Sequence, residues 1–354
     1  MEKNSDEKCL YLSFNPDSSL FCIGTNKGFR VFTSNPFKCV GKRDISGGIG
    51  IVEILNNTNI FALVGTEENL KFGPNKVILW DELKQKVANQ LIVSNNVKII
   101  KIKRTKIFII EENNILVFTF GNYEKIDSLK TFSNKIGIFG ISLDPKINMI
   151  SYPSPDVGKI ITKDYDNKIE GNFTVGQINA HKNEIIALVM NYDGSLIASA
   201  SERGTIIKIF KSKDGSLLQE LRRGTEPAEI YSLAFDFKSR YIACSSNKGT
   251  IHIFNIKNDE IEEKNKNQKS IIGNVVSFLG FKNEYLSSEW SFAQYRLSCK
   301  EKNIISFNHE KDDIIIVITL NGKYYQGIFD MKKKGEIKTN IEGEIWNMEV
   351  ENKK

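Results

Sequence analysis

Several catalytic signatures are missing from this chain of 354 residues. It has no G-x-S-x-G, P-loop or H-E-x-x-H motif, and it contains only 3 histidines. Its carboxylates form no pair that spacing singles out. A lysine-rich arm, zinc-finger spacing and a stacking-aromatic motif are absent too, which argues against nucleic acid. We therefore expect a protein that is not an enzyme and uses no metal or cofactor.

Paired cysteines and long apolar runs are also lacking. The 5 cysteines are odd in number and widely spaced, without a C-x-x-C pair, which indicates buried, reduced thiols in a cytosolic protein. Residues 1–8 are polar and charged, unlike a signal peptide. No apolar run approaches the ~20 residues of a membrane span. Any membrane contact is therefore expected to be peripheral, and the net charge of +6 is weak support for an anionic partner.

Proline is scarce, with 7 residues, whereas isoleucine, valine and phenylalanine are plentiful, and this mix favours strands. A repeat then decides the fold. Residues 196–205 align with 241–250 at an offset of 45 (241 minus 196), and residues 20–29 fit the same template. Short strands separated by polar turns at this period are typical of WD-type blades. The sequence predicts an all-β, seven-bladed WD-repeat-type β-propeller.

The chain length accommodates roughly seven such blades in one domain over residues 1–354. A long insertion, residues 257–287, interrupts blade six, and a strand is expected to resume at residues 290–297. The pattern does not show how the ring closes. The approximate blades are residues 8–48, 49–92, 93–134, 135–180, 181–224, 225–302 and the remainder.

Two adjacent arginines, Arg222 and Arg223, end a predicted strand and precede Gly224. Successive strand side chains point to opposite sides, so each guanidinium can enter a different pocket. The planar guanidinium fork is well shaped to bind phosphate, and a glycine lets a ligand come close. The alternative is that the arginines only add charge to an outer strand, which discourages pairing with the edge of another sheet. This alternative would be preferred if the neighbouring residues were not considered.

Those surroundings are hydroxyl and cationic side chains in two matching sets. A phosphorylated sugar ring requires both kinds of group. Hydrogen bonding of turns within each blade is the alternative role of the hydroxyls. His181, before the first strand of blade five, has either a structural or a ligand-binding role. The sets are Ser199, Ser201, Arg203 and Thr205 in blade five, and Ser245, Ser246, Lys248, Thr250 and His252 in blade six.

The insertion in blade six carries apolar residues near helical spacing. A segment this short would be marginal as a free helix, but it could fold on contact with an apolar phase. It is either an interfacial anchor for a membrane or a strip that packs back on blade six, and the sequence favours neither. The residues are Ile271, Ile272, Val275, Val276, Phe278 and Leu279.

Residues 180–256 resemble blades five and six of the PROPPIN, or WIPI, proteins, which are phosphoinositide-binding propellers of autophagy and endosomal membranes. The family motif Phe-Arg-Arg-Gly is present as Leu221-Arg222-Arg223-Gly224, a conservative departure at its first position. The similarity continues at residues 35–37, 77–81, 231–235 and 288–294. It therefore extends over most of the chain.

The resemblance implies two rim pockets for phosphatidylinositol 3-phosphate and the 3,5-bisphosphate. It also implies that residues 257–287 correspond to the membrane-inserting loop of the family. In pocket one Arg222 would act with Ser201, Arg203, Thr205 and His181, and in pocket two Arg223 would act with Ser246, Lys248, Thr250 and His252.

The resemblance further implies a cytoplasmic protein, monomeric in solution and peripheral on endosomal, vacuolar or autophagosomal membranes. It would recruit autophagy proteins such as the bridge-like lipid-transfer protein, with the loop at residues 67–74 as a candidate contact. Two alternatives stay open. One is a protein-interaction scaffold without lipid binding, whose partner binds the top face or central channel. The other is a lipid-binding propeller that serves organelle maintenance or vesicle traffic.

Overall fold

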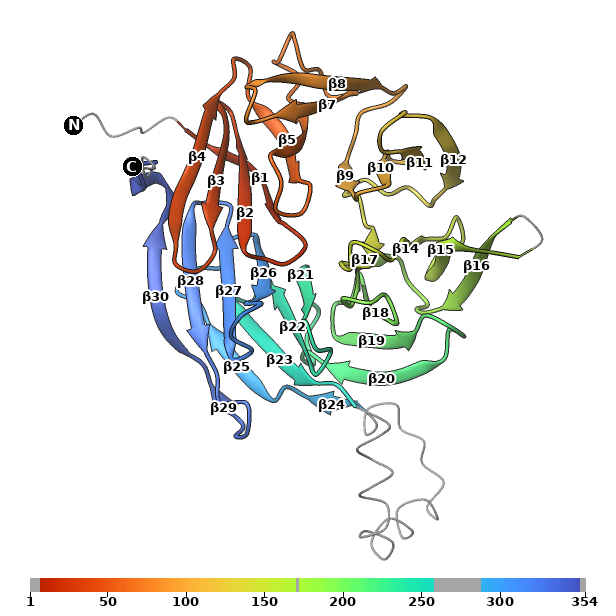
Figure 1. The fold of residues 1–354 in the computed structure, drawn as a ribbon. Helices are drawn as coiled ribbons and strands as arrows, with labels where there is room; N and C mark the ends of the chain where they lie inside the picture. The colour runs from red at the N-terminus through yellow and green to blue at the C-terminus, as the bar shows by residue number, and fades with distance from the viewer. Residues whose placement is uncertain (1–6, 170–171, 258–287, 351–354) are drawn as a thin grey trace, which may run out of the picture.

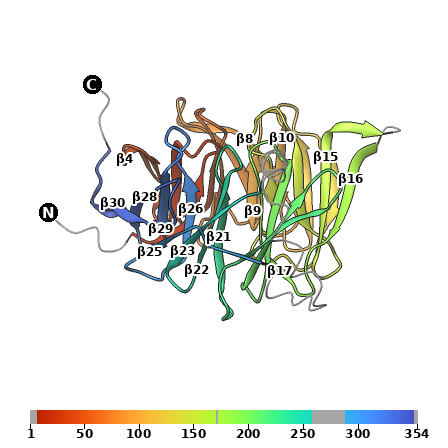
Figure 2. The ribbon, with the colours of Figure 1, turned by 90° about the horizontal axis from the view of Figure 1, so that it is seen from below.

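The structure, a computed structural model, describes residues 7–169, 172–257 and 288–350. These residues form seven sheets around a ring (Figure 1). Each sheet has four antiparallel strands, and two of the sheets gain a short fifth strand that runs parallel. Figure 2 shows the same ring turned by 90°, with the sheets side by side. The predicted all-β, seven-bladed propeller is confirmed. The interpretation of residues 271–279 falls on a segment, 258–287, that lies outside the described residues.

Blades one to four follow one another along the chain. Blade one comprises β1 (Cys9–Phe14), β2 (Leu20–Thr25), β3 (Gly28–Thr33) and β4 (Lys38–Asp44), and blade two β5 (Ile49–Ile54), β6 (Ile60–Gly65), β7 (Lys76–Asp81) and β8 (Lys86–Ile92). Blade three comprises β9 (Ile99–Ile102), β10 (Lys106–Ile110), β11 (Asn114–Thr119) and β12 (Lys125–Lys130). Blade four comprises β13 (Gly140–Ile141), β14 (Met149–Pro153), β15 (Lys159–Ile169) and β16 (Asn172–Asn179).

Blades five to seven complete the ring. Blade five comprises β17 (Ile185–Met190), β18 (Leu196–Ser201), β19 (Ile206–Lys211) and β20 (Leu217–Arg222). Blade six comprises β21 (Ile230–Phe235), β22 (Tyr241–Ser246), β23 (Thr250–Asn255) and β25 (Ala293–Arg296). Blade seven comprises β26 (Asn303–Phe307), β27 (Ile314–Thr319), β28 (Lys323–Ile328) and β30 (Lys338–Glu344), followed by the short 3-10 helix η2 (Ile345–Asn347).

Two short strands cross from one blade to the next. β24 (Glu289–Trp290) runs parallel to β20 of blade five, and β29 (Gly335–Glu336) runs parallel to β25 of blade six. The prediction of one strand over residues 290–297 is therefore wrong, because the returning chain first joins the sheet of blade five and enters blade six only at Ala293. These crossings tie the outer edges of blades five, six and seven together.

Glycines make the turns between the second and third strands of blades five and six. Gly204 has a φ of +58° and Gly249 a φ of +78°, a region that residues with a Cβ rarely adopt. A Cβ at Gly204 would also lie 1.9 Å from the carbonyl oxygen of Ala228. Since β18 and β22 end before these turns, Arg203 and Lys248 lie in turns and not on strands.

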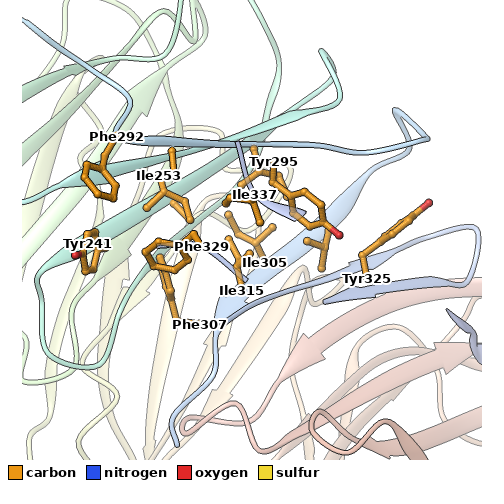
Figure 3. Close-up of a cluster of buried hydrophobic side chains, with 14 residues drawn as sticks. Tyr241, Ile253, Phe292, Tyr295, Ile305, Phe307, Ile315, Tyr325, Phe329 and Ile337 are labelled. Atoms are coloured by element: carbon orange, nitrogen blue, oxygen red, sulfur yellow. The ribbon is translucent and has the colours of Figure 1, made fainter. Parts of the chain in front are cut away.

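Apolar side chains between neighbouring sheets form the core. Between blades six and seven, Tyr241 and Ile253 pack with Phe307 and Phe329, all less than 10% exposed (Figure 3). Burial of this kind stabilises a fold by ~25 cal/mol per Å² of apolar surface. Each sheet therefore buries both faces against its neighbours.

The ring closes by side-chain packing between blades seven and one, a point that the sequence left open. The rings of Phe37 and Tyr324 stack with centroids 4.2 Å apart. The Tyr324 hydroxyl donates to the carbonyl oxygen of Ser34 at 2.6 Å. A single β-bridge, between Cys39 and Val350, adds a backbone contact among the described residues. Each blade thus keeps its own four strands.

The 5 cysteines are free; Cys22, Cys39 and Cys244 are buried as expected, whereas Cys9 and Cys299 are only partly buried. Across residues 7–169, 172–257 and 288–350, we find no cluster of three His, Cys, Asp or Glu side chains that could hold a metal ion. Over the same residues the chain forms no helix with the length and apolar character needed to cross a membrane.

Candidate functional site

Arg222 shares one face of the blade-five sheet with Lys208 and Glu220. The strand register pairs Lys208 with both Ser199 and Glu220, and it pairs Ile206 with Arg222. Since every second side chain of a strand lies on the same face, these groups all point to one side. The Lys208 Nζ lies 3.1 Å from the Glu220 carboxylate. The face therefore carries two cations and one carboxylate.

This face looks toward blade four, where His181 joins it. The His181 Nε2 lies 2.9 Å from the Ser199 Oγ. Burial, with the nearby charge of Lys208, lowers the pKa of His181 to about 4, so the ring is neutral near pH 7. The apolar side chains of the same face pack against blade four through Ile197, Phe210, Ile160 and Ile178.

Arg222 itself is 3% exposed, at the end of β20. Its Nε donates to the Ser288 Oγ at 2.8 Å, and Ser288 comes directly before β24. Leu221 points to the opposite face and is fully buried between blades five and six. The first arginine is therefore fixed by the chain that returns from the insertion.

Arg223 follows β20 and is 5% exposed. Its Nε donates to the carbonyl oxygen of Gly204 at 2.9 Å, and a terminal nitrogen donates to the carbonyl oxygen of Glu226. Burial lowers the pKa of Arg223, and the negative charge of Glu226 partly offsets this effect. The two carbonyl acceptors fix the guanidinium without neutralising its charge.

Arg223, the second arginine, lies close enough to His252 of blade six to affect its pKa. Cys244 and His252 are register partners, and Cys244 packs in the core between blades five and six, so His252 faces blade five. Burial, followed by the charge of Arg223, lowers the pKa of His252 to about 4. The His252 Nδ1 lies 3.2 Å from the Ser291 Oγ. The two arginines therefore diverge, one toward blade four and one toward blade six.

The remaining predicted side chains of the blade-six set lie around Arg223. Ser246 is buried, and its Oγ accepts a hydrogen bond from the backbone N of Lys248 at 3.4 Å. The exposed Lys248 pairs with the exposed Glu226 at 3.2 Å. Thr250 begins β23, two residues before His252 and on the same face. Ser246, Thr250 and His252 thus share the face of blade six that looks toward blade five, whereas Ser245 lies on the opposite face of β22.

Fewer side chains of the blade-five set lie near Arg222. Thr205 lies beside the arginine pair, because its carbonyl oxygen accepts from the backbone N of Arg223 at 2.9 Å. Ser201 ends β18 on the face of Ser199. Arg203 is exposed in the turn, and its carbonyl oxygen accepts from Ala228, toward blade six. Arg203 thus lies outside strand β18, at the exposed turn between β18 and β19.

Sequence reasoning missed Lys208, the second cation on the face of Arg222. It also missed Ser288 and Ser291, which contact Arg222 and His252. Counting back two residues from Arg222 and across to the paired strand would have found Lys208. The serines follow the insertion, so no local pattern relates them to the arginines.

The partly buried His181 and His252 predict a loss of stability in mild acid. The pKa of each histidine is lowered to about 4 in the folded chain, whereas a histidine in the unfolded chain has a pKa near 6.5. The unfolded state therefore binds more protons between these values, and stability falls as pH drops from 6.5 toward 4. We expect His181 and His252 each to cost roughly 1–2 kcal/mol at pH 5 relative to pH 7.5. Urea unfolding at both pH values measures this, and the variant His181→Gln with His252→Gln should show a flatter profile.

A cavity of about 580 Å³ occupies the axis of the ring. The innermost strands line it with apolar side chains such as Leu12, Phe139 and Leu233. Lys135 and Lys302 also border it. This channel is the feature that a scaffold without lipid binding would use.

A protein-family model described as PROPPIN matches residues 8–337. The Autophagy-related protein 18e of Arabidopsis thaliana is 31% identical over 339 residues, which cover 95% of this chain and 87% of that protein. The SVP1-like protein 2 of Pichia angusta is 30% identical over 295 residues, which cover 82% of this chain and 81% of that protein.

Solved structures of similar fold include Hsv2 of Kluyveromyces lactis with its complete loop 6CD, at a TM-score of 0.78 and 21% identity, covering 96% of this chain and 100% of that one. Another is a complex of KlAtg21 with the coiled-coil of AgAtg16, at a TM-score of 0.75 and 21% identity, covering 96% and 99%. These structures agree with the fold. With the family match over nearly its whole length, this chain belongs to the PROPPIN family, autophagy-related propellers known for phosphoinositide binding and not as enzymes.

Proposed function

We propose that this protein is a non-enzymatic effector that docks edge-on to membranes. It binds phosphatidylinositol 3-phosphate and 3,5-bisphosphate through two rim pockets and recruits autophagy or membrane-remodelling machinery there. The observation that carries the proposal is the divergence of Arg222 and Arg223 to opposite faces of the blade-five sheet, each beside hydroxyl groups and a histidine.

Pocket one lies on the face of Arg222. Lys208 and Arg222 supply positive charge, and Ser199 and Ser201 supply hydroxyls. Neutral His181 can donate or accept a hydrogen bond, as its tautomer allows. A phosphate that enters this face would compete with Glu220 for Lys208. The exchange is feasible because Lys208 would still be paired with an anion afterwards.

Pocket two lies between Arg223 and β23. Arg223 supplies a fixed charge, and His252, Thr250 and Ser246 line the strand face beside it. Lys248 can turn from Glu226 to a ligand at little cost, because exposed ion pairs contribute at most about 1 kcal/mol. Both pockets thus combine a guanidinium with hydroxyls.

Two weak pockets on one rigid body give strong membrane binding. When two sites engage one surface, effective concentration raises avidity by ~10²–10⁴. The core between blades five and six holds the two pockets at a fixed separation, since Leu221 and Ile242 are fully buried there. A vesicle with many headgroups would therefore be bound far more tightly than one soluble headgroup.

A lipid panel tests the proposal. We expect the protein to float with vesicles that contain either phosphoinositide and to stay behind with phosphatidylcholine alone. Equal binding to every anionic lipid at matched charge would contradict it. The scaffold alternative predicts no dependence on headgroup and a partner in the axial cavity lined by Lys135 and Lys302. Imaging in the protein's own cell separates autophagy from organelle maintenance or vesicle traffic.

The loop at residues 67–74 in blade two is the proposed contact for a protein partner. Asn69 is buried, donates to the carbonyl oxygen of Gly48 at 2.8 Å and accepts from the backbone N of Phe72 at 2.8 Å. Phe72 is 3% exposed, whereas Leu70 is 98% exposed. The loop is thus held firmly while it presents one apolar side chain.

We predict that Leu70→Ser weakens capture of the bridge-like lipid-transfer protein by about 10-fold or more, because burying a leucine contributes ~1.5–3 kcal/mol. Pull-down with the purified partner measures it. Leu83→Ser is a matched control, since Leu83 is 81% exposed at the other end of β7. Equal capture by both variants would exclude this loop as the contact. Vesicle binding should be unchanged in each.

A further inference from the structure

Trp290 is an exposed aromatic residue on the rim beside Arg222. It is 60% exposed, and the strand register places it opposite Arg222 in the parallel pair of β24 and β20. The chain is held on both sides of this residue, since the Ser291 Oγ after it lies 3.2 Å from the His252 Nδ1 and two residues before it are hydrogen-bonded to β20. Ser288 accepts from Arg222, and Glu289 accepts from Gln219 at 3.0 Å. The backbone therefore fixes the indole outward beside the arginine.

A lysine-rich hairpin lies on the next part of the same rim. It is the turn at residues 330–336, which carries Lys332, Lys333 and Lys334, all exposed. This turn connects β28 to β30, and its last two residues form β29, in which Gly335 pairs with Ala293, three residues after Trp290. In Figure 1, β20, β24 and β29 lie along the same lower edge of the ring.

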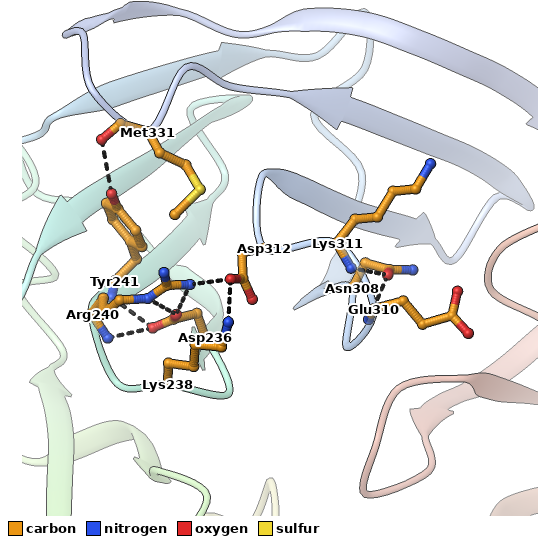
Figure 4. Close-up of polar contacts among 9 residues, drawn as sticks. All are labelled: Asp236, Lys238, Arg240, Tyr241, Asn308, Glu310, Lys311, Asp312 and Met331. Atoms are coloured by element: carbon orange, nitrogen blue, oxygen red, sulfur yellow. Dashed lines mark hydrogen bonds and ion pairs between the residues drawn. The ribbon is translucent and has the colours of Figure 1, made fainter.

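The core holds both ends of this hairpin. Phe329 and Ile337 flank it and are 3% and 7% exposed in the cluster of blades six and seven (Figure 3). The Tyr241 hydroxyl donates to the carbonyl oxygen of Met331 at 3.0 Å (Figure 4). Lysines on a turn anchored in this way keep a set position relative to β24.

The charge of this strip is positive. Lys338 joins the three hairpin lysines in lining a hollow of the rim, together with Asp313, Asp330 and Glu336. Glu336 pairs with Arg296 at 3.2 Å, and Asp330 accepts from the backbone N of Lys332 at 2.8 Å. With Arg296 the cations number five against three carboxylates, and none of the three hairpin lysines forms an ion pair within the described residues.

We propose that Trp290 and the hairpin lysines Lys332–Lys334 form a docking strip for the surface of an anionic bilayer. The proposal rests on the proposed function, because it places a membrane against this rim. Tryptophan is enriched at membrane interfaces, where its ring sits at headgroup depth. Juxtamembrane lysines bind anionic leaflets without reading a particular headgroup. The strip makes binding depend on bulk anionic lipid as well as on phosphoinositide.

Vesicles that carry phosphatidylinositol 3-phosphate, with or without phosphatidylserine, test the strip. With phosphatidylserine present, Lys332→Glu, Lys333→Glu and Lys334→Glu together should lower partition by ~100-fold, as each lysine contributes about 5-fold. Without it the loss should be much smaller. Lys86→Glu, Lys125→Glu and Lys130→Glu together are the matched control, since these exposed lysines lie on the rim strands β8 and β12.

Tryptophan fluorescence tests the aromatic part. Emission of the wild-type protein should shift to the blue on these vesicles, and Trp290→Phe should remove the shift, since Trp80 and Trp346 lie in blade two and after blade seven. Trp290→Ser should lower partition by about 10-fold. Binding of the soluble inositol 1,3-bisphosphate, measured by calorimetry, should be the same in all variants.

These measurements separate the two proposals. Absence of soluble-headgroup binding in the wild-type protein would sink the proposed function. Intact headgroup binding, with equal vesicle partition for the hairpin and control triplets, would overturn the strip alone. An unshifted emission on bound vesicles would do the same. Loss of an acidic protein partner, with vesicle partition unchanged, would assign the lysines to that partner instead.

Discussion

Replacing Arg222 and Arg223 together by threonine is expected to lower binding to phosphoinositide vesicles by ~100-fold or more. Each arginine places a charge on its own face, and a hydrogen bond to a charged group contributes about 1.5–3 kcal/mol. Loss of both removes the charge-assisted contact from each pocket and therefore also the avidity between them. Flotation of the folded double variant measures the effect.

The matched control removes the same charge elsewhere on the ring. Arg43 in blade one and Arg104 in blade three are at least partly exposed, and Arg43→Thr with Arg104→Thr leaves the blade-five sheet intact. It should bind vesicles as the wild type does. If the folded Arg222 and Arg223 variant still floats with these lipids, the proposed pockets are excluded.

Single variants separate the two faces. Calorimetry with a soluble inositol 1,3-bisphosphate should count two sites on the wild type and one on either Arg222→Thr or Arg223→Thr. The reason is geometric, since Arg222 shares its face with Lys208 and Arg223 acts on His252. Loss of both sites in one single variant would mean that the arginines serve one pocket.

The repeat made the fold predictable, because each blade encodes the same local units. Alternating strands, polar turns and a glycine such as Gly204 or Gly249 depend only on neighbours in the sequence. The closure through Phe37 and Tyr324 joins residues nearly a whole chain apart. The strand crossings of Trp290 and Gly335 involve two-residue strands with no periodic signal. Such long-range pairings leave no trace in a local pattern.

The candidate site shows the same contrast between local features, which the sequence predicts, and long-range ones, which it does not. Alternation along a strand predicts that Arg222 and Arg223 point to opposite faces. In the structure β20 already ends at Arg222, and the two guanidinium groups contact different partners, Ser288 for Arg222 and the carbonyl oxygens of Gly204 and Glu226 for Arg223. The sequence paired the arginines with the duplicated hydroxyl sets, but Lys208 has no duplicate at the matching place and was missed. The sequence placed Arg203 in the blade-five set, and the structure puts it in the exposed turn before Gly204. The repeat between blades five and six identified the residues that the two blades share. It did not identify residues such as Lys208 that occur in one blade only.

The buried ion pair of Glu7 and Arg30 should be the most costly single contact to break in the ring. Their side chains are 2% and 4% exposed, and the Arg30 Nε donates to Glu7 at 3.1 Å. Thr25 donates to the same carboxylate, and the Arg30 guanidinium lies 5.5 Å from the ring centre of Trp346. The pair therefore joins the start of blade one to η2, where the ring closes.

We predict that Glu7→Gln destabilises the protein by about 3–5 kcal/mol, because it leaves the Arg30 charge buried without its counter-ion. Burial alone would raise the pKa of Glu7, but the hydrogen bond and charge of Arg30 hold it below its usual range. The stabilisation is thus present above the unfolded pKa and is lost as pH falls through the folded one. Urea unfolding at pH 7 measures the cost. Glu336→Gln, which breaks the exposed pair with Arg296, should cost less than about 1 kcal/mol, and equal costs would contradict a structural role for the buried pair in closing the ring.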